Sequence, residues 1–255
     1  MKISLSVAII TFNEEKNILR CLESVKDVAD DVVVVDSFST DKTEEICLQQ
    51  GVRFIKHAFE GHIQQKNFAI TQARFPYILS LDADEALSEE LKKEIKIIKE
   101  NWNADGYTVN RLNNYCGKWI RHTGWYPDRK LRLWDSHKGK WTGMNPHDRF
   151  EMQKGSKISH IRGDLLHYSY HSISQHIDQI NKFSGISARA KFEKGIKIPL
   201  VYTLLRVYAT FLKKYIIKLG FLDGYYGYII SKLSAHGVFL KDIKLGELHR
   251  KRKIR

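Results

Sequence analysis

The sequence predicts an α/β protein in which a mostly parallel sheet carries helices on both faces. Three observations support this fold class. Apolar segments alternate with amphipathic ones over residues 1–101, and the apolar segments are hydrophobic throughout, as strands buried on both faces are. Polar, acid-rich loops follow several of these segments. With 255 residues, of which 43% are hydrophobic, the chain is long enough for one large domain and an extension.

Strand and helix alternate through residues 1–105. Four strands are expected at 5–12, 30–37, 52–57 and 77–84, and four helices at 13–26, 40–50, 63–73 and 88–101. In the first helix Ile18, Leu22 and Val25 share one face, and the fourth helix repeats this spacing. This alternation is typical of parallel βαβ units.

The pattern changes after residue 105. Short β-like segments such as GYTVNRL and RKLRLWD alternate with loops rich in Trp, Tyr, His and Arg, and a helix is expected from 172 to 194. Residues 106–195 are therefore predicted to extend the same domain with antiparallel strands and long loops, the kind of segment that carries functional side chains.

Residues 196–255 form a third predicted segment, a basic amphipathic helical extension. From residue 197 on, 13 Lys and Arg face 3 Asp and Glu, which gives +10 of the net charge of +13. The segment could pack on the main domain as a pair of helices, or it could lie on an anionic membrane surface with lysines reaching the headgroups. No uncharged stretch approaches the about 20 residues that span a bilayer. No recognised module frames the basic residues for nucleic acid, so none is expected as a partner.

The cysteines and the N-terminus favour the cytoplasm. Cys21, Cys47 and Cys116 are odd in number and lack Cys-x-x-Cys spacing, which argues against a disulfide framework or a zinc ribbon. The apolar N-terminal stretch is short, ends in charge and has no small-residue cleavage site, so a buried first strand is expected rather than a signal peptide.

Three polar clusters follow the ends of predicted strands, at residues 11–15, 36–41 and 82–84. Ligands of parallel α/β sheets bind beyond the carboxyl ends of the strands, so the clusters are expected to converge on one edge. Some of these residues could be ordinary helix N-caps. Caps do not explain Asp36 and Asp82, which end otherwise apolar strands.

Asp82 and Asp84 suggest a cation site. Two apart in an extended chain, they are expected to point the same way. Two carboxylates facing together require a cation, and a hard, oxygen-only site suits Mg²⁺ or Mn²⁺. Such a metal usually takes several further ligands from a substrate diphosphate.

Longer stretches carry a resemblance to a known family. VAIITFNEEKNILRCLESVKDVADDVVVVDSFSTDKTEEIC, QKNFAI and YILSLDADEALSEEL resemble glycosyltransferase family 2, inverting enzymes of the GT-A fold that use nucleotide sugars. WIRHTGWYPDRKLRLW, NPHDRFEM, GDLLHYSY and KLGFLDGYYGYIISKLSAHGVFLK resemble its lipopolysaccharide-core β-1,4-glucosyltransferase branch. The resemblance covers nearly the whole chain. It implies a Rossmann-like GT-A domain, with residues 1–105 as the nucleotide-sugar-binding half and 106–195 as the acceptor-side half.

The resemblance also implies roles at the donor site. Thr11, Asn13 and Glu14 resemble the first nucleotide-binding loop, and Asp36 resembles the acid that contacts the uracil ring. Lys66 would lie near the nucleotide or its phosphates, unless it is a solvated helix lysine.

Two further residues are implied to meet the metal or the sugar. Asp82 would face the ribose and Asp84 the metal, with Mg²⁺ or Mn²⁺ as cofactor. His167 resembles the histidine that GT-A enzymes offer to the metal, although a histidine beside Leu and Tyr can equally be a core residue.

Inverting transfer needs one base on the acceptor side of the anomeric carbon. The stretch NPHDRF offers His147 and Asp148, where the family usually has His-Glu. Asp148 is the predicted general base, and a salt bridge to Arg149 or Arg129 is the alternative. Its carboxylate reaches one methylene less than that of a glutamate.

The stretch GWYPDRK supplies candidates for binding the acceptor. Trp125 and Tyr126 are possible sugar-stacking surfaces, and Arg129 and Arg132 are available for anionic groups.

The predicted function is transfer of a hexose, expected to be glucose from UDP-glucose, to a lipid-linked saccharide such as lipopolysaccharide core, with metal assistance. The enzyme would be peripheral on the inner face of the cytoplasmic membrane. A nucleotidyltransferase is an alternative, although TFNEEKN lacks the glycine of a phosphate loop. A non-catalytic binder of anionic lipid or nucleic acid would explain the basic segment but leaves Asp36, Asp82 and Asp84 without a purpose.

Overall fold

The structure, a computed structural model, describes residues 1–144 and 147–254, without the side chains of residues 144, 147 and 252–254. The chain divides into two compact units. Unit 1 comprises residues 1–112 and 128–168, and unit 2 comprises residues 113–127 and 169–255. The predicted segments 1–105, 106–195 and 196–255 follow the order of the chain, whereas each unit combines stretches that are distant in sequence.

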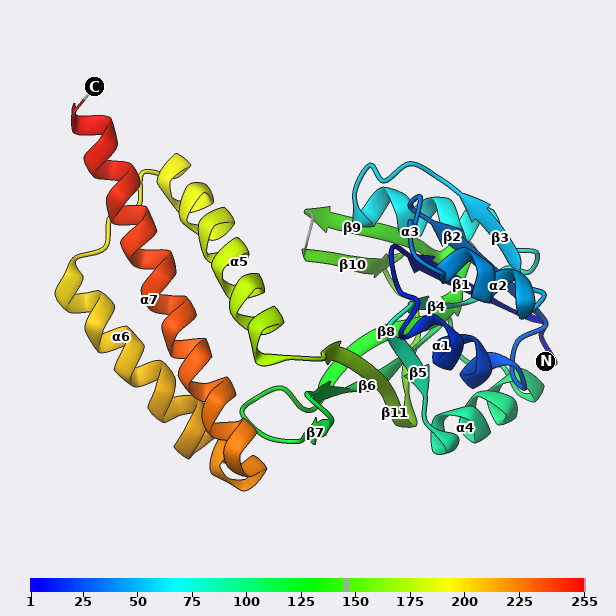
Figure 1. Ribbon diagram of the computed structural model, residues 1–255. Helices are drawn as coiled ribbons and strands as arrows, with labels where there is room; N and C mark the ends of the chain where they lie inside the picture. Colours follow the sequence, from blue (N-terminus) through cyan, green and yellow to red (C-terminus); the bar gives the residue numbers. More distant parts are fainter. Residues whose placement is uncertain (145–146, 255) are drawn as a thin grey trace. The chain divides into compact units, whose positions relative to one another are not determined.

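Unit 1 is built on a mixed sheet with the strand order β3-β2-β1-β4-β8-β6-β11-β5 (Figure 1). The parallel strands are β1 (Leu5–Thr11), β2 (Asp31–Asp36), β3 (Arg53–Lys56) and β4 (Tyr77–Asp82). The added strands are β5 (Glu85–Leu87), β6 (Gly106–Tyr115), β8 (Asp128–Asp135) and β11 (Ile158–Tyr170). Antiparallel pairing of β8 with β4 and β6, and of β5 with β11, confirms the predicted extension.

Buried side chains of β1 alternate between two cores. Leu5, Val7 and Ile9 pack with residues of α1 (Ile18–Val25), α2 (Thr43–Gln49) and α4 (Glu89–Glu100). Ala8 belongs to a second core with residues of α3 (His62–Thr71). Because successive residues of a strand point to opposite faces, the sheet is covered by helices on both sides, as predicted.

A separate hairpin carries the second half of the site. It consists of β9 (Gly139–Met144) and β10 (His147–Met152), and the short helix η1 (Ser136–Lys138) precedes it. The ring of Phe150 stacks on that of Trp134 with centroids 3.8 Å apart, and Trp141 meets both rings edge-on. These aromatic contacts fix the hairpin on the α3 side of the sheet, since all three residues belong to the second core.

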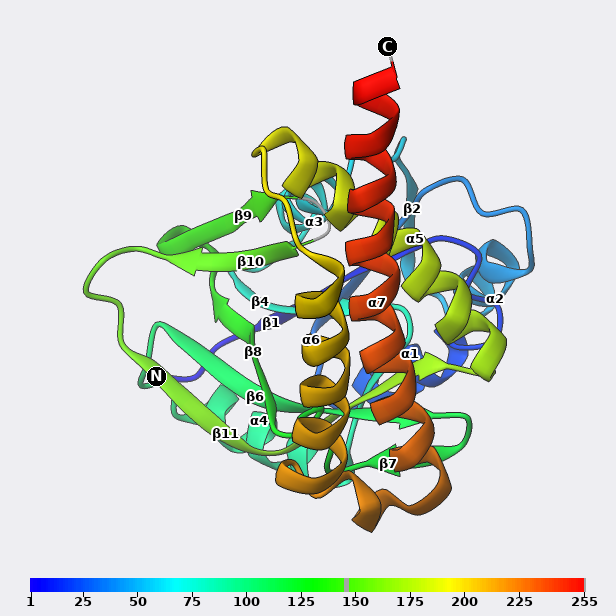
Figure 2. The same ribbon diagram turned by 90° about the vertical axis from the view of Figure 1, so that its left-hand side faces the viewer.

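Unit 2 is mainly helical. Besides β7 (Lys118–Ile120), it contains α5 (Ile173–Glu193), α6 (Leu200–Leu212), the π-helical turn η2 (Lys213–Ile217), the 3₁₀ turn η3 (Gly220–Asp223) and α7 (Gly224–Ile254). The long helix α7 packs along both α5 and α6 (Figures 1 and 2). Ser172 begins α5 with a capping box to Gln175, close to the predicted start. Among the helices of the described residues, none combines the length and hydrophobicity that crossing a membrane requires.

An aromatic cluster forms the small core of unit 2. The ring of Tyr115 meets those of Trp125, Tyr170 and His176 at centroid distances of 5.3–5.8 Å. The Tyr115 hydroxyl lies 3.0 Å from His176 Nδ1. Burial lowers the pKa of His176 to about 4. The imidazole is therefore neutral at physiological pH.

Candidate active site

The loops that follow β1 and β2 are tied to each other by hydrogen bonds. The backbone N–H of Asn13 donates to Ser39 Oγ at 2.7 Å, and the N–H of Thr40 donates to Asn13 Oδ1 at 2.8 Å. The N–H of Glu14 donates to Thr43 Oγ1 at 2.8 Å. Asn13 has φ of 54°, a left-handed conformation that Asn tolerates better than most residues. Asn13 therefore connects the two loops and caps neither α1 nor α2.

Glu14 has an altered acidity at this edge. Burial raises its pKa to about 7, and the neighbouring charges of Asp84 and Asp41 add to the effect, while a hydrogen bond from Asn17 opposes it. A carboxyl group with this pKa is partly protonated at neutral pH. It can therefore donate a hydrogen bond as well as accept one.

Asp36 and Thr11 are both buried. The carboxylate of Asp36 accepts hydrogen bonds from the backbone N–H of Ser39 at 2.8 Å and from the Ser39 hydroxyl. In this conformation it holds the loop and presents no surface to a ligand, so its contact with uracil stays a prediction. Thr11 Oγ1 makes no hydrogen bond within the described residues.

At the end of β4, Asp82 is surrounded by cations. Its oxygens lie 3.1 Å from Lys66 Nζ and 3.1 Å from an Arg132 nitrogen. Burial alone would raise the pKa of Asp82, but the two cations outweigh it and hold the pKa well below its usual range. The same Arg132 nitrogen lies 2.5 Å from Glu85 Oε1.

The prediction that Arg132 serves an anionic acceptor group is wrong. Its side chain is buried and occupied by two carboxylates. The register of β6 and β8 shifts at this point, so Arg132 has no residue opposite it in β6. Bulges of this kind redirect a side chain, here toward Asp82 and Glu85.

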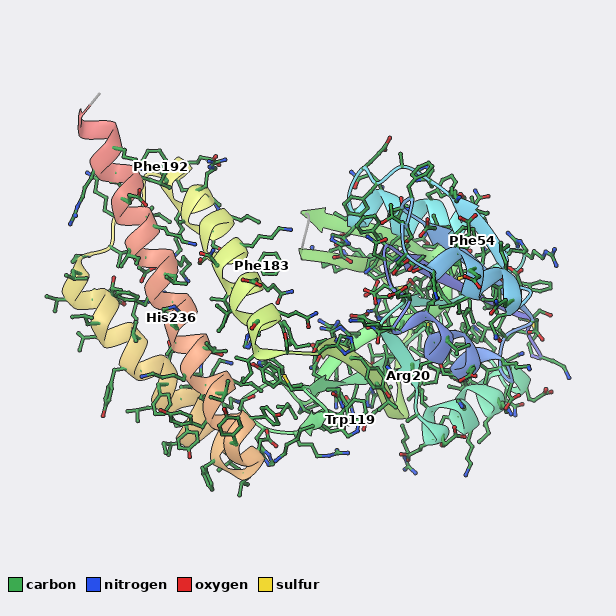
Figure 3. All side chains as sticks on the ribbon, in the orientation of Figure 1. Arg20, Phe54, Trp119, Phe183, Phe192 and His236 are labelled. Carbon is green, nitrogen blue, oxygen red and sulfur yellow. The ribbon has the colours of Figure 1, made fainter. Side chains whose placement is uncertain are left out.

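The expectation that Asp82 and Asp84 point the same way is also wrong. The strand ends at Asp82, and residues 83 and 84 form a turn, so the alternation of an extended chain does not reach Asp84. Asp84 instead contacts His167 on β11, with 3.1 Å between its Oδ2 and the imidazole Nε2. His167 is thus no isolated core histidine. Tyr168 follows His167 on β11. The guanidinium carbon of Arg20 on α1, a residue labelled in Figure 3, lies 3.8 Å from the centroid of the Tyr168 ring.

Asp84 and His167 are the residues that would hold a metal ion. Asp84 Oδ2 and His167 Nε2 lie 3.1 Å apart, close enough for both atoms to coordinate one metal ion. No group of three or more His, Cys, Asp and Glu side chains in the described residues forms a ready-made metal site. Two protein ligands fit Mg²⁺ or Mn²⁺ nonetheless, because such ions commonly take their other ligands from phosphates and water.

Lys66 joins the two halves of the site. Its side chain is only 6% exposed, which excludes a solvated lysine, and Nζ lies 2.8 Å from Asp148 Oδ2 as well as 3.1 Å from Asp82. It also lies 4.4 Å from the ring centroid of Trp141. The partner of Asp148 is therefore Lys66 on α3, and neither Arg129 nor Arg149. His147 lies in β10, but its side chain is outside the description.

Asn67, next to Lys66, holds the hairpin in place. Its amide Nδ2 donates to the carbonyl of Trp141 at 3.0 Å, and its Oδ1 accepts from the Trp141 backbone N–H at 3.0 Å. Sequence reasoning missed this role, and it also missed Glu85 as a partner of Arg132. The signal for Glu85 was present, since a third carboxylate so close to Asp82 and Asp84 needs a cation of its own.

The predicted acceptor residues fall in different units. Trp125 and Tyr126 belong to unit 2, where Trp125 is half-buried in the aromatic cluster and Arg121 lies 5.5 Å from the Tyr126 ring centroid. Arg129 belongs to unit 1 and is exposed. These positions do not show whether Trp125, Tyr126 or Arg129 contacts a sugar, so their acceptor roles remain predictions.

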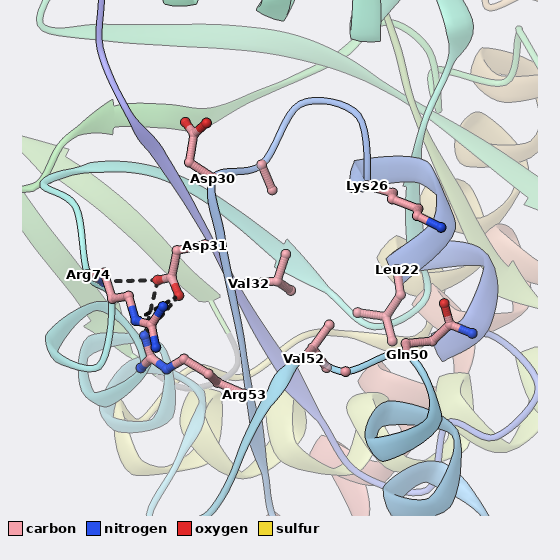
Figure 4. Close-up of a pocket in the computed structure, with 11 residues that line it drawn as sticks. Leu22, Lys26, Asp30, Asp31, Val32, Gln50, Val52, Arg53 and Arg74 are labelled. Atoms are coloured by element: carbon pink, nitrogen blue, oxygen red, sulfur yellow. Dashed lines mark hydrogen bonds and ion pairs between the residues drawn. The ribbon is translucent and has the colours of Figure 1, made fainter.

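A cavity of about 520 Å³ in unit 1 opens beside the ion-paired side chains of Lys66, Asp82 and Asp148. It is lined by Lys66, Asp82, Arg111, Arg129, Lys130, Leu131, Arg132, Trp141, Asp148, Arg149 and Phe150. A second cavity of about 350 Å³ lies at the start of β2 (Figure 4). There Asp31 pairs with Arg53 at 2.9 Å and with Arg74 at 3.7 Å. This is the amino end of the parallel strands, opposite the edge where ligands of such sheets bind.

A model of the family described as Glycosyl transferase family 2 matches residues 6–164, more than half of the chain. The chain belongs to glycosyltransferase family 2. Together with the sheet described above, this assignment confirms the GT-A fold, and it sets aside the nucleotidyltransferase and the non-catalytic binder.

Relatives of this glycosyltransferase extend over nearly its whole length. A glycosyltransferase of Rickettsia typhi, itself uncharacterized, is 32% identical and aligned over 96% of this chain and 87% of its own. The lipopolysaccharide core biosynthesis glycosyltransferase LpsC of Rhizobium meliloti is 29% identical over 97% of this chain and 94% of its own. The similarity to lipopolysaccharide-core enzymes is thus confirmed.

Solved structures resemble this glycosyltransferase more distantly. S. aureus TarS aligns with 97% of this chain and 91% of its own at 15% identity, with a TM-score of 0.46. Glucosyl-3-phosphoglycerate synthase of Mycobacterium tuberculosis, in complex with Mn²⁺, UDP and glucosyl-3-phosphoglycerate, covers 44% of each chain at 18% identity and a TM-score of 0.35. Scores at this level bear on neither donor nor acceptor.

Proposed function

We propose that this enzyme transfers a hexose from a UDP-sugar, with UDP-glucose the first candidate, to a hydroxyl of a lipid-linked saccharide. The observation that carries the proposal is the ion-paired trio of Asp82, Lys66 and Asp148, which borders a cavity beside the carboxyl end of β4. This edge of the sheet is where ligands bind in α/β folds. The name of LpsC supports a saccharide of lipopolysaccharide core as the acceptor class.

In the proposed reaction the acceptor oxygen bonds to the anomeric carbon while the bond from that carbon to the diphosphate oxygen breaks. The hydroxyl proton passes to the Asp148 carboxylate. UDP leaves with the electron pair of the broken bond, and the configuration at the anomeric carbon inverts. Lys66 binds one oxygen of Asp148, and within the described residues the other oxygen, Oδ1, makes no hydrogen bond. Oδ1 is therefore the atom expected to receive the proton.

The donor would lie at the interlocked loops after β1 and β2. Thr11, Asn13 and Glu14 are proposed to contact the nucleotide. Asp36 is proposed to contact its base, and Asp82 its ribose. A divalent cation held by Asp84 and His167 would supply positive charge to the leaving diphosphate.

We further propose that unit 2 binds an anionic membrane surface, which would place the enzyme on the inner face of the cytoplasmic membrane. Half of the large hydrophobic side chains that are exposed in the described residues lie between Leu200 and Tyr228. Exposed Lys213 and Lys218 lie among them. An apolar face interspersed with lysines is typical of helices that lie in the membrane interface.

Release of UDP tests the proposed reaction directly. Purified enzyme is incubated with UDP-glucose or other UDP-hexoses, with and without Mn²⁺, and with a lipid-linked core saccharide as acceptor. Acceptor-dependent UDP release that requires Mn²⁺ is the expected result. It should fall at least about 100-fold in Asp84→Asn, since a lost metal ligand removes charge stabilisation of the leaving group.

Asp27→Asn is the matched control, because Asp27 is an exposed acid on the loop after α1, and its one ion pair within the described residues is a contact of 4.0 Å with Lys96. It should release UDP at the wild-type rate. Equal rates with and without metal, in a preparation stripped by chelator, would contradict the metal role. Absence of UDP release with every UDP-hexose would contradict the donor class.

A further inference from the structure

The cations that line the cavity beside Asp148 differ in how far carboxylates neutralise them, and the less neutralised ones are more exposed. The paired cations are Lys66, which contacts Asp82 and Asp148, Arg132, which contacts Asp82 and Glu85, and Arg111, which contacts Asp128 and Glu85. Lys66 and Arg132 are more than nine-tenths buried. The charge of these three cations is neutralised within the protein, so none is available to a ligand without breaking an ion pair.

Three other cations of the cavity lack such compensation. Arg129 makes no ion pair with any described residue and is exposed. Arg149 has its nearest described carboxylate, that of Glu151, at 3.8 Å, and its side chain is 72% exposed. An ion pair this long and this exposed contributes little.

Lys130 is the third cation. It lies 3.1 Å from Asp128, but the same carboxylate also binds Arg111 at 2.8 Å. One negative charge is therefore shared between two cations. Together, Arg129, Lys130 and Arg149 leave the outer part of the cavity with excess positive charge.

The position of this charge relates it to the acceptor. Arg149 on β10 and Arg129 and Lys130 on β8 line the same cavity as Asp148. Of the residues predicted to face the donor, Asp82 and Lys66 also line this cavity, whereas the residues of the loops after β1 and β2 and the proposed metal ligands Asp84 and His167 do not. An anion bound by the three cations would thus lie near the proposed base, apart from the proposed metal ligands.

We propose that the acceptor saccharide carries an oxyanion, a phosphate monoester or a sugar carboxylate, and that Arg129, Lys130 and Arg149 bind it. The proposal rests on the proposed function, because it assigns this side of the cavity to the acceptor. Guanidinium groups suit the task, since their paired N–H donors match the two oxygens of a phosphate or carboxylate. Bound in this way, the oxyanion would orient the attacking hydroxyl toward Asp148.

The test measures anion binding with the donor site already filled. Full-length enzyme is saturated with UDP and Mg²⁺, and inorganic phosphate, glucuronate or neutral glucose is titrated while the arginine Nε–H signals are followed by NMR. Millimolar binding of an oxyanion, about −4 kcal/mol, is expected. Glucose at the same concentrations should leave the signals unchanged. Phosphate alone would identify a phosphate monoester, and glucuronate alone a sugar acid.

Variants then test whether Arg129 and Arg149 bind the oxyanion. Arg129→Ala/Arg149→Ala should weaken oxyanion binding at least about tenfold, as loss of two charge-assisted contacts predicts. The matched control is Arg162→Ala, because Arg162 is an exposed arginine of β11 that does not line the cavity. UDP affinity, measured by calorimetry, should be the same in all three proteins.

Wild-type oxyanion affinity in the double variant would overturn the proposal. A parallel loss of UDP affinity would also overturn it, because the cations would then serve the donor diphosphate. If wild-type enzyme does not bind UDP at all, the proposed function fails. The comparison of the double variant with Arg162→Ala, repeated without UDP, would still decide whether an oxyanion binds here.

Discussion

The ammonium nitrogen of Lys66 lies 2.8 Å from the carboxylate of Asp148, a residue 82 positions further along the chain. This contact connects α3 to the β9–β10 hairpin, and the same nitrogen reaches Asp82 at the end of β4. One lysine thus contacts a predicted donor residue and the predicted base. Because the lysine is almost fully buried, its loss would leave two carboxylates without their cation.

Lys66→Met should therefore reduce both stability and transfer. Removing one partner of a buried ion pair typically costs about 3–5 kcal/mol, and partial exposure of Asp82 and Asp148 should bring the cost down to about 2–3 kcal/mol of unfolding free energy. Transfer should fall about 100-fold, because the Asp148 carboxylate loses the group that orients it. Urea unfolding and UDP release measure the two effects.

The double variant Lys66→Met/Asp148→Asn separates pairing from packing. If the ion pair matters, neutralising Asp148 should restore part of the lost stability, and the two single effects should not add. Additive losses of stability would mean that Lys66 contributes through its aliphatic chain and its contact with Trp141.

Asp148→Asn tests the base itself. The amide keeps the size of the side chain but cannot accept the proton, so transfer should fall roughly 10²- to 10⁴-fold. UDP binding, measured by calorimetry, should be nearly unchanged, since Asp148 itself is not one of the proposed donor residues. The matched control is Asp135→Asn on β8, whose carboxylate caps η1 instead of lining the cavity.

Transfer within a few-fold of wild type in Asp148→Asn would place the base elsewhere, and His147→Ala would be the next variant to measure. Slow hydrolysis of the UDP-sugar can survive in Asp148→Asn, because water does not need the geometry of the saccharide acceptor. Only the acceptor-dependent rate decides the question.

The limits of sequence reasoning are clear from these same residues. Burial of β1, β2 and β4 is encoded in runs such as DVVVVD, which need no knowledge of distant partners. The direction of Asp84 depends on where β4 ends, and the strand ends at Asp82, two residues earlier than the predicted strand 77–84. The pairing of Lys66 with Asp148 depends on how the hairpin docks, which Asn67 and the stacked Trp134 and Phe150 determine. Contacts between distant segments leave no local pattern.

His176 predicts a pH dependence of stability. Burial lowers its pKa to about 4, below the ordinary value of 6.5. Between these pH values the unfolded chain binds a proton that the folded chain does not. The contribution of neutral His176 to the free energy of unfolding is therefore fully present above pH 6.5 and is lost as the pH falls toward 4.

Thermal unfolding of the full chain at pH 7.5, 6 and 5 measures this effect. His176→Gln should flatten the decline of the melting temperature below pH 6.5, even if losing the Tyr115 contact lowers all values. His236→Gln, which changes an exposed histidine of α7 labelled in Figure 3, should leave the decline as it is. Parallel curves for wild type and His176→Gln would show that other groups cause the decline.

The membrane proposal makes a prediction about one face of α6. Val201 and Leu205 are 72% and 62% exposed and lie one helical turn apart, so they share a face. Val201→Glu/Leu205→Glu should reduce binding to phosphatidylglycerol vesicles at least about tenfold, because two charges would have to enter the apolar part of the interface. Sedimentation with vesicles, after circular dichroism has established that the variant is folded, measures the loss.

The lysines supply a second arm of the same experiment. Lys213 and Lys218 are exposed, whereas Lys214 is half-buried and donates to the carbonyl of Thr123, so Lys214 is left unchanged. Lys213→Glu/Lys218→Glu should weaken binding and reduce its dependence on salt, since each basic residue near the surface contributes about 1 kcal/mol. Ile177→Glu is the control, because Ile177 is an exposed apolar residue of α5 outside this face. Unchanged sedimentation of both double variants would exclude this face as the membrane contact and would leave its apolar side chains for a protein partner.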